Sequence, residues 1–290
     1  MGEKQHLIKY FGVKKGIIGI MKIGFIGIGN MGGSLLKAVC HRLGGVDIGV
    51  CDMDKEKIAA ACGEYGCTGC TSAEIAAQAE YIFLGVKPQA MAAMLDEIKA
   101  VLAERAKNGG RFILVSMAAG LSVSSIQSMA GGAYPVIRIM PNIPAAVGEG
   151  MILYANTTDI TDGELAVFLD FMSLAGTLDG VKESLIDAGS ALSGCGPAFV
   201  SMMIEALADG AVACGLPRNK AMLYAEQTVL GTAKYLMETG LHPGEMKDNV
   251  TSPAGTTIQG VRVLEENGFR GACMDAVIAA YEKTVNLQKR

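Results

Sequence analysis

A glycine-rich hexapeptide near the start of the chain restricts its fold more than any other feature. It follows a short apolar run, 22–27, and opens a segment, 30–43, whose apolar residues recur with helical spacing. Its residues are Gly27, Ile28, Gly29, Asn30, Met31 and Gly32. A strand, a tight turn and a helix in this order predict a dinucleotide site, because the glycines admit the turn, the pyrophosphate and close helix packing.

An acidic residue follows the second predicted strand, 46–51, at the spacing that this motif requires. The carboxylate of Asp52 can accept both ribose hydroxyls of NAD, and it would repel the 2′-phosphate of NADP. No Arg stands beside it, but Lys55 and Lys57 could reach a phosphate. The sequence therefore favours NADH but does not decide between NADH and NADPH.

Apolar runs and helix-length segments alternate through the first half of the chain. Further strands are predicted at 81–86, 112–116 and 136–139, with one last strand at 151–155. This alternation predicts an α/β fold, a Rossmann-type doubly wound parallel sheet. From Glu183 onward only helices are predicted, at 185–214, 218–239, 253–266 and 269–287.

Two domains are expected after a short leader or extension of uncertain status, residues 1–20, which ends where Met21 offers a natural start. Residues 21–182 would form the dinucleotide-binding domain. Residues 183–290 would form an all-helical domain for substrate binding and dimerisation. Its long Ala-rich helices carry few charges, so they need a partner to cover their apolar faces.

Composition excludes several classes of protein. Lys and Arg total 25 against 29 Asp and Glu, and aromatic residues make up 6%, so nucleic acid is not an expected partner. The eight Cys are scattered, and although Cys67 and Cys70 form a CxxC pair, a zinc site would need a second ligand pair. The only histidines are His6, His41 and His242, so no metal is expected. No uninterrupted apolar run of membrane-spanning length and no signal peptide is apparent, which predicts a cytoplasmic protein with reduced thiols and no membrane partner.

Three loops after predicted strands are candidate walls of the cofactor site, since open α/β sheets bind ligands at the carboxyl ends of their strands. They are 85–88, 116–120 and 138–144. The first two could equally be ordinary connections. In the third, two prolines bracket Asn142 and could present its amide beside a nicotinamide.

Small polar residues gather in the helical half at Thr251–Thr257. Their hydroxyls and the free N–H groups of a helix start could hold a small carboxylate. The same pattern also fits a doubled helix N-cap with Pro253 in the first turn, and the residues alone favour this simpler interpretation.

From Met21 onward the chain resembles the pyrroline-5-carboxylate reductases, which reduce a cyclic imine to proline with NAD(P)H. The resemblance rests on seven segments, 27–32, 84–89, 116–122, 138–150, 192–200, 205–218 and 242–268. The chain departs from the family at Cys195, where Ser is usual, and at Ala254, where Gly is common. It also lacks the Arg that often follows the second strand, which bears on the choice of cofactor.

This resemblance implies a set of site residues. The cofactor would be held by the Gly27–Gly32 turn and Asp52, and by Ser72, Val86, Lys87, Pro88, Ala118, Ala119 and Gly120. The substrate carboxylate would be held by Ser252, Gly255, Thr256 and Thr257, with Glu183 and Asn249 nearby. Thr257 would be the catalytic residue, hydrogen-bonded to the ring nitrogen. The resemblance also implies a dimer with interlocked helices, in which each pocket borrows this loop from the other subunit, and assembly into larger rings.

Two other functions are compatible with parts of the sequence. The 3-hydroxyacid dehydrogenases share the glycine turn, but their carbonyl chemistry needs a proton donor, and no Lys occurs between Ala188 and Leu216. A nucleotide sensor without catalysis would not need the anion-binding pattern at Thr251–Thr257. A protonated imine is already electrophilic, so its reduction is compatible with a site that lacks a catalytic histidine.

Overall fold

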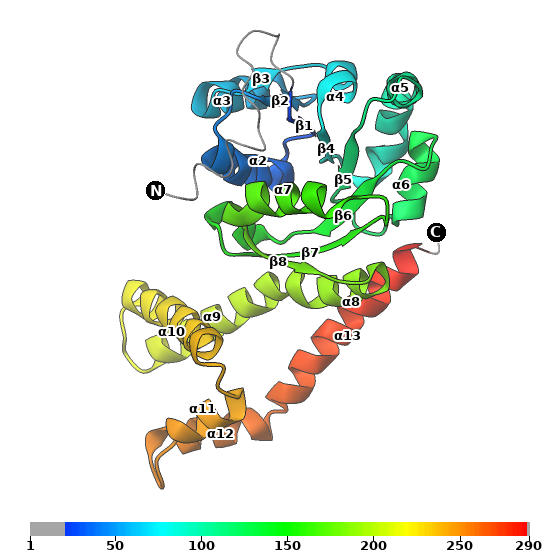
Figure 1. The fold of residues 1–290 in the computed structure, drawn as a ribbon. Helices are drawn as coiled ribbons and strands as arrows, with labels where there is room; N and C mark the ends of the chain where they lie inside the picture. Colours follow the sequence, from blue (N-terminus) through cyan, green and yellow to red (C-terminus); the bar gives the residue numbers. More distant parts are fainter. Residues whose placement is uncertain (1–20, 289–290) are drawn as a thin grey trace. The chain divides into compact units, whose positions relative to one another are not determined.

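The computed structural model describes residues 21–288, and the expectation for the leader at 1–20 lies outside this range. The chain divides into two compact units, and the boundary lies between Ile186 and Asp187. Figure 1 shows strands and helices in the first unit and helices alone in the second. The predicted domain boundary between residues 182 and 183 stays a prediction.

An eight-stranded sheet forms the first unit, in the order β3-β2-β1-β4-β5-β6-β7-β8. Its strands are β1 Ile23–Ile26, β2 Ile48–Cys51, β3 Thr68–Gly69, β4 Tyr81–Leu84, β5 Ile113–Ser116, β6 Val136–Met140, β7 Gly150–Asn156 and β8 Gly176–Gly180. The first six run parallel to one another. The predicted Rossmann-type sheet is therefore confirmed, and it is parallel except for one antiparallel pair.

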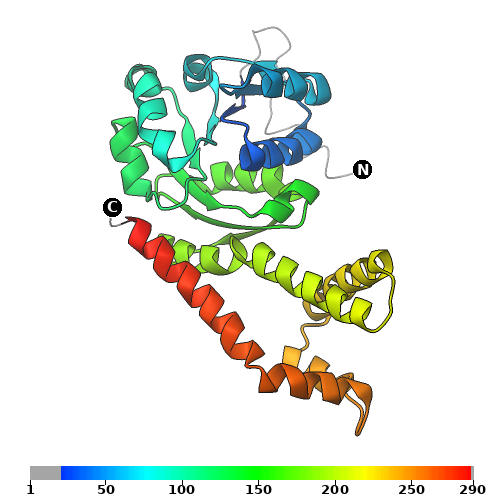
Figure 2. The same cartoon turned by 180° about the vertical axis from the view of Figure 1, so that it is seen from behind.

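Helices cover both faces of this sheet, as Figures 1 and 2 show from opposite sides. They are α2 Asn30–Leu43, α3 Lys55–Tyr65, α4 Ser72–Gln78, α5 Pro88–Lys107, α6 Val123–Ala130 and α7 Asp162–Met172, with short 3₁₀ turns η1 Ile143–Val147 and η2 Ser173–Ala175. Strand residues alternate between two cores, so Phe25 and Phe83 stack at 4.3 Å on the α2 and α7 side. Ile82 and Leu84 pack on the α5 side. Burial on both faces explains the nearly continuous apolar strands.

Two features of the sheet differ from the sequence prediction. β7 pairs antiparallel with β6, since the connecting segment 141–149 is shorter than the dozen or so residues that a parallel crossover needs. β8 then pairs parallel with β7 and was not predicted, because Gly176–Gly180 is polar, largely exposed and lacks an apolar run. The two-residue β3 was missed for the same reason.

The second unit contains the rest of the chain as helices. They are α8 Glu183–Ser193, which begins in the first unit, then α9 Gly196–Ala213, α10 Arg218–Thr239, α11 Pro243–Asn249, α12 Thr256–Glu266 and α13 Phe269–Gln288. The helix predicted at 185–214 is broken at Gly194 and Cys195. The one predicted at 253–266 starts only at Thr256, because Ala254 takes a left-handed φ of 57° just before it. α11 was not predicted, because it is only 7 residues long.

Few apolar side chains of the second unit are buried. The described core there consists of Ala208, Ala221 and Ala225 with a few partly buried neighbours, whereas Met202, Leu230 and Met237 are exposed. The stretch Glu183–Ala213, which comprises α8 and α9, is long and apolar enough, by length and composition alone, to cross a membrane, although we expected no such segment. Only 11% of its most apolar part is buried. An apolar surface of this extent indicates an interaction surface.

An ion pair at the amino end of β5 should make the stability of the first unit depend on pH. Arg111 donates hydrogen bonds of 2.7 and 3.0 Å to the carboxylate of Glu164 and lowers its pKa to about 2. A depressed pKa stabilises the fold above the ordinary value of the carboxyl, and this stabilisation is lost as the pH falls toward 2. We therefore expect Glu164→Gln to lower the melting temperature at pH 7 but to approach wild type at about pH 3. Melting curves across this range test it, and a constant difference would contradict it.

Candidate active site

The glycine turn lies between β1 and α2, where the sequence predicts it. Gly27 has a φ of +95°, a conformation that residues with a Cβ avoid, and its N–H donates to the Cys51 carbonyl at 2.7 Å. Gly29 is the N-cap of α2 and offers no side-chain hydrogen bond to the helix. The first N–H groups of α2 are thus left for another acceptor.

The carbonyl oxygen of Gly27 is enclosed by two further glycines. A Cβ at Gly32 would lie 2.3 Å from this oxygen, and a Cβ at Gly85 would lie 2.1 Å from it. Gly85 follows β4, so the close packing involves a glycine outside the hexapeptide. Its role was not predicted, because only the strand pairing of β1 with β4 brings it to the turn.

Asp52 supports the same turn from the end of β2. Its Oδ2 accepts a hydrogen bond from the Ile28 N–H at 2.8 Å, and its Oδ1 accepts one from the Asp54 N–H at 3.0 Å. Asp54 caps α3, and its Oδ2 lies 3.8 Å from Nζ of Lys57. The carboxylate of Asp52 therefore contacts the turn before α2, and the ammonium group of Lys57, paired with Asp54, lines the same region.

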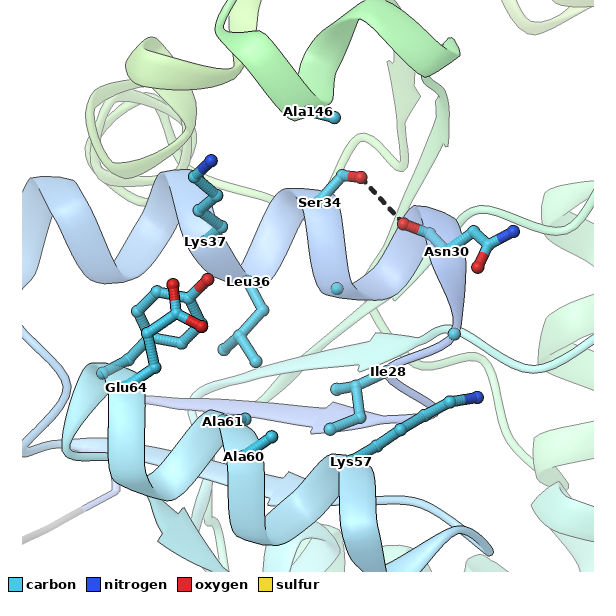
Figure 3. Close-up of a pocket in the computed structure, with 13 residues that line it drawn as sticks. Ile28, Asn30, Ser34, Leu36, Lys37, Lys57, Ala60, Ala61, Glu64 and Ala146 are labelled. Carbon is cyan, nitrogen blue, oxygen red and sulfur yellow. Dashed lines mark hydrogen bonds between the residues drawn. The ribbon is translucent and has the colours of Figure 1, made fainter.

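A groove of about 400 Å³ lies beside the turn, between α2 and α3. Figure 3 shows Asn30 at the first turn of α2, with its carbonyl accepting from Ser34, and Lys57 extending along α3. Lys37 and Glu64 line the groove farther along the two helices. Lys57 was predicted as a residue that could reach a phosphate, whereas no role was predicted for Lys37, because its helical position alone does not reveal the groove.

The other predicted cofactor residues follow the neighbouring strands. After β4 come Val86, then Lys87 as the N-cap of α5 and Pro88 as its first residue. After β5 come Ala118, buried, and the exposed Ala119, with Gly120 at a φ of +78°. Ser72 opens α4 after β3. All of them therefore lie at the carboxyl ends of parallel strands, where such sheets bind ligands.

Asn142 and Glu183 make defined contacts inside the first unit. Asn142 is buried, and its Oδ1 accepts a hydrogen bond from the Met151 N–H at 2.9 Å, so its amide holds the start of β7. Glu183 is half-buried, and its Oε1 accepts from the Val123 N–H at 2.7 Å. Glu183 therefore contacts the segment that follows β5, although the resemblance placed it among the substrate residues.

The remaining predicted substrate residues lie in the second unit, between α11 and α12. Asn249 ends α11, and the exposed Ser252 begins the turn that contains Ala254. Gly255 is the N-cap of α12 and provides no side-chain cap, so the doubled N-cap considered above is wrong. Thr256 and Thr257 open α12 and are exposed. The loop therefore leaves both hydroxyls and the first N–H groups of α12 accessible.

The residues present fit a dinucleotide. A Cβ built on Gly29 meets no atom within 4 Å, so the backbone of the turn is open on that side. The uncapped start of α2 supplies N–H donors and the positive end of a helix dipole for a pyrophosphate. Asp52 stands within hydrogen-bond distance of the same turn and can serve a ribose.

Comparison with known proteins agrees with this geometry. A family model described as NADP oxidoreductase, coenzyme F420-dependent, matches residues 22–120, and one described as pyrroline-5-carboxylate reductase dimerisation matches residues 183–287. The pyrroline-5-carboxylate reductase of Methanosarcina acetivorans is 41% identical over 273 residues, 93% of this chain and 98% of that protein.

Two solved structures are similar over nearly the whole chain. The pyrroline-5-carboxylate reductase of Coxiella burnetii has a TM-score of 0.84 at 29% identity and covers 93% of this chain and 100% of that one. The Plasmodium falciparum pyrroline carboxylate reductase with NADP bound has a TM-score of 0.82 at 28% identity and covers 94% and 100%.

The fold and the glycine turn define an NAD(P)-dependent oxidoreductase. The second unit contains the dimerisation domain that is typical of pyrroline-5-carboxylate reductases. The chain belongs to the pyrroline-5-carboxylate reductase family, and its reaction is the NAD(P)H-dependent reduction of pyrroline-5-carboxylate to proline.

Proposed function

We propose that the first unit binds the dinucleotide across the carboxyl ends of β2, β1, β4 and β5. The pyrophosphate would lie on the Gly27–Gly32 turn, the adenosine ribose on Asp52 with Ser72 nearby, and the nicotinamide half on the β4 and β5 side. Support comes from the uncapped α2 and the open face of Gly29. The walls of this site would be Val86, Lys87, Pro88, Ala118, Ala119, Gly120 and Asn142.

The substrate carboxylate would be held by the loop between α11 and α12. Ser252 and Thr256 would contribute hydroxyls, and the N–H groups that follow Gly255 would add the positive end of the α12 dipole. Asn249 and Glu183 would complete the substrate site. Support comes from the exposure of these hydroxyls and from the absence of a side-chain cap on α12.

Thr257 would be the catalytic residue, its hydroxyl oxygen accepting a hydrogen bond from the protonated ring nitrogen. When bound, the nicotinamide would supply the hydride, and the residues that hold the two ligands would align it with the electrophilic imine carbon. No histidine is needed as an acid. His41 packs edge-on against Tyr65 with 6.0 Å between ring centroids, and His242 Nδ1 accepts from the Gly244 N–H at 3.1 Å, which places both in structural roles.

We propose NADH as the preferred cofactor, with Asp52 setting this preference. Asp52→Asn removes the charge but keeps an oxygen for the Ile28 N–H, so the turn should survive. We expect the ratio of kcat/KM for NADH over NADPH to fall about tenfold, or about 1.4 kcal/mol. Steady-state kinetics with both cofactors measure this ratio. Lys57→Gln is the matched variant and should change it in the opposite direction, while an unchanged ratio in Asp52→Asn would remove Asp52 from this role.

The helices of the second unit would interlock in a homodimer, so that each pocket borrows the Ser252–Thr257 loop from the other subunit. Support comes from the exposed apolar side chains of this unit and from the dimerisation domain. Larger rings would assemble from such dimers. The protein would work in the cytoplasm as an enzyme of proline biosynthesis.

The open face of Gly29 beside an uncapped helix is the observation that carries this proposal. The test is oxidation of NADH and of NADPH with pyrroline-5-carboxylate, alongside a 3-oxoacid as control. We expect rapid oxidation with the imine, faster with NADH, and none with the oxoacid. Oxidation with the oxoacid alone would assign a carbonyl reductase instead.

A further inference from the structure

Arg138 is the largest fully buried side chain in the described part of the chain, and it is 2% exposed. It lies in β6, in register with Ser116 of β5 and Ala155 of β7. Removing a guanidinium from water costs several kcal/mol unless its partners compensate. The other four residues of β6 are apolar and buried, so an apolar side chain would fill this position at a smaller cost.

Glu183 connects this buried charge to a helix start. Its Oε1 lies 3.3 Å from Nη1 of Arg138, and the same oxygen accepts the 2.7 Å hydrogen bond from the Val123 N–H. Val123 is the first residue of α6, where an N–H group lacks a partner within the helix and a negative charge is favourable. Glu183 therefore fastens α6 to β6.

The loop that we propose as a cofactor wall leads directly into α6, the helix that Glu183 contacts. This loop leaves β5 at Ser116, passes through Ala118–Gly120 and enters α6 at Val123 after its N-cap Ser122. It lies on the side of β1 opposite to Asp52, so it would face the nicotinamide half of the dinucleotide and not the adenosine half. The position of Val123 thus governs how this wall meets the nicotinamide.

We propose that Arg138 is a positioning residue for the nicotinamide half of the cofactor and acts through Glu183 on the Ala118–Gly120 loop. The inference rests on the proposed function, which assigns the loop to that half. Arg138 is too deeply buried to contact a ligand itself. Its effect is geometric, because displacement of a catalytic wall by about 1 Å is enough to weaken a productive complex.

The test compares two ligands that share the adenosine diphosphate ribose half. Arg138→Met should raise the Kd of the full-length protein for NADH about tenfold, while the Kd for ADP-ribose, which lacks nicotinamide, should change less than about twofold. Arg138→Lys, which keeps a positive charge, should restore part of the NADH affinity. Calorimetric titration of each variant gives both constants without any imine present.

Arg111→Met is the matched control, since it breaks another Arg–Glu pair at the amino end of β5. It should lower the melting temperature and leave the ratio of the two Kd values unchanged. Equal weakening of both ligands in Arg138→Met, or the same ratio change in Arg111→Met, would overturn the proposal.

If Arg138→Met does not fold, Glu183→Gln tests the same link. It keeps an acceptor for the Val123 N–H and weakens the attraction to Arg138, so NADH affinity should fall by a smaller factor and ADP-ribose affinity should not. An unchanged NADH affinity in Glu183→Gln would reject the inference. Failure of the wild-type protein to reduce the imine would instead reject the proposed function, because the binding ratio does not depend on that reaction.

Discussion

Thr257→Ala is expected to lower kcat/KM for the imine by between about ten- and hundredfold while NADH binds as tightly as before. A hydrogen bond to a charged group contributes about 1.5–3 kcal/mol, and the proposed bond to the ring nitrogen is of this kind. The Thr257 side chain is exposed at the start of α12 and makes no hydrogen bond with another described residue, so its removal should leave the fold intact.

Steady-state kinetics and titration with NADH measure the two effects separately. Thr251→Ala is the matched control, because the Thr251 hydroxyl donates to the Lys247 carbonyl at 2.6 Å and so serves α11. It should leave kcat/KM within about twofold of wild type, since no ligand contact is lost. Loss of NADH affinity in Thr257→Ala, with imine reduction otherwise normal, would contradict the assignment of this residue.

Gly29→Ala is expected to weaken NADH and NADPH binding by at least about tenfold with little loss of stability. The φ of Gly29 is −63°, which alanine adopts readily, and its Cβ would meet no protein atom within 4 Å. The methyl group would instead occupy the open face where the pyrophosphate is proposed to lie. Alanine at an N-cap costs at most about 1 kcal/mol relative to glycine.

Cofactor titration and thermal melting together test this expectation. Gly63→Ala is the control, because Gly63 lies inside α3 and its added Cβ also meets nothing. That variant should keep its cofactor affinity and gain up to about 1 kcal/mol of stability. Unchanged cofactor affinity in a well-folded Gly29→Ala protein would place the pyrophosphate elsewhere.

Local patterns predicted the helices well where start and stop signals were strong. The bounds of α2 and α10 are those that the sequence indicated, because a glycine ends each helix and periodic apolar residues fill it. β1, β4 and β5 were also found, since strands buried on both faces are nearly continuous apolar runs. The α/β class and the glycine turn followed from these elements.

Features that depend on tertiary contacts could not be predicted. The direction of β7 depends on which neighbour it pairs with, and β8 exists only because β7 offers it an edge. An ion pair joins the buried Arg138 to the half-buried Glu183 across 45 residues, and no local pattern marks either residue as a partner. For the same reason the loop pattern around Asn142 predicted a cofactor role without revealing the hydrogen bond that Asn142 accepts from Met151.

The enclosure of the Gly27 carbonyl has an evolutionary consequence. Gly32 and Gly85 come from different elements, yet the same oxygen atom leaves no room for a Cβ at either position. A lineage could replace Gly85 only by first separating β1 from the segment after β4, which would also break the pairing of two central strands. Replacement of Gly32 would instead require α2 to move away from the turn. Saturation mutagenesis should therefore find Gly85 among the positions that tolerate substitution least. It would rank with the glycines of the hexapeptide, although it lies outside that motif.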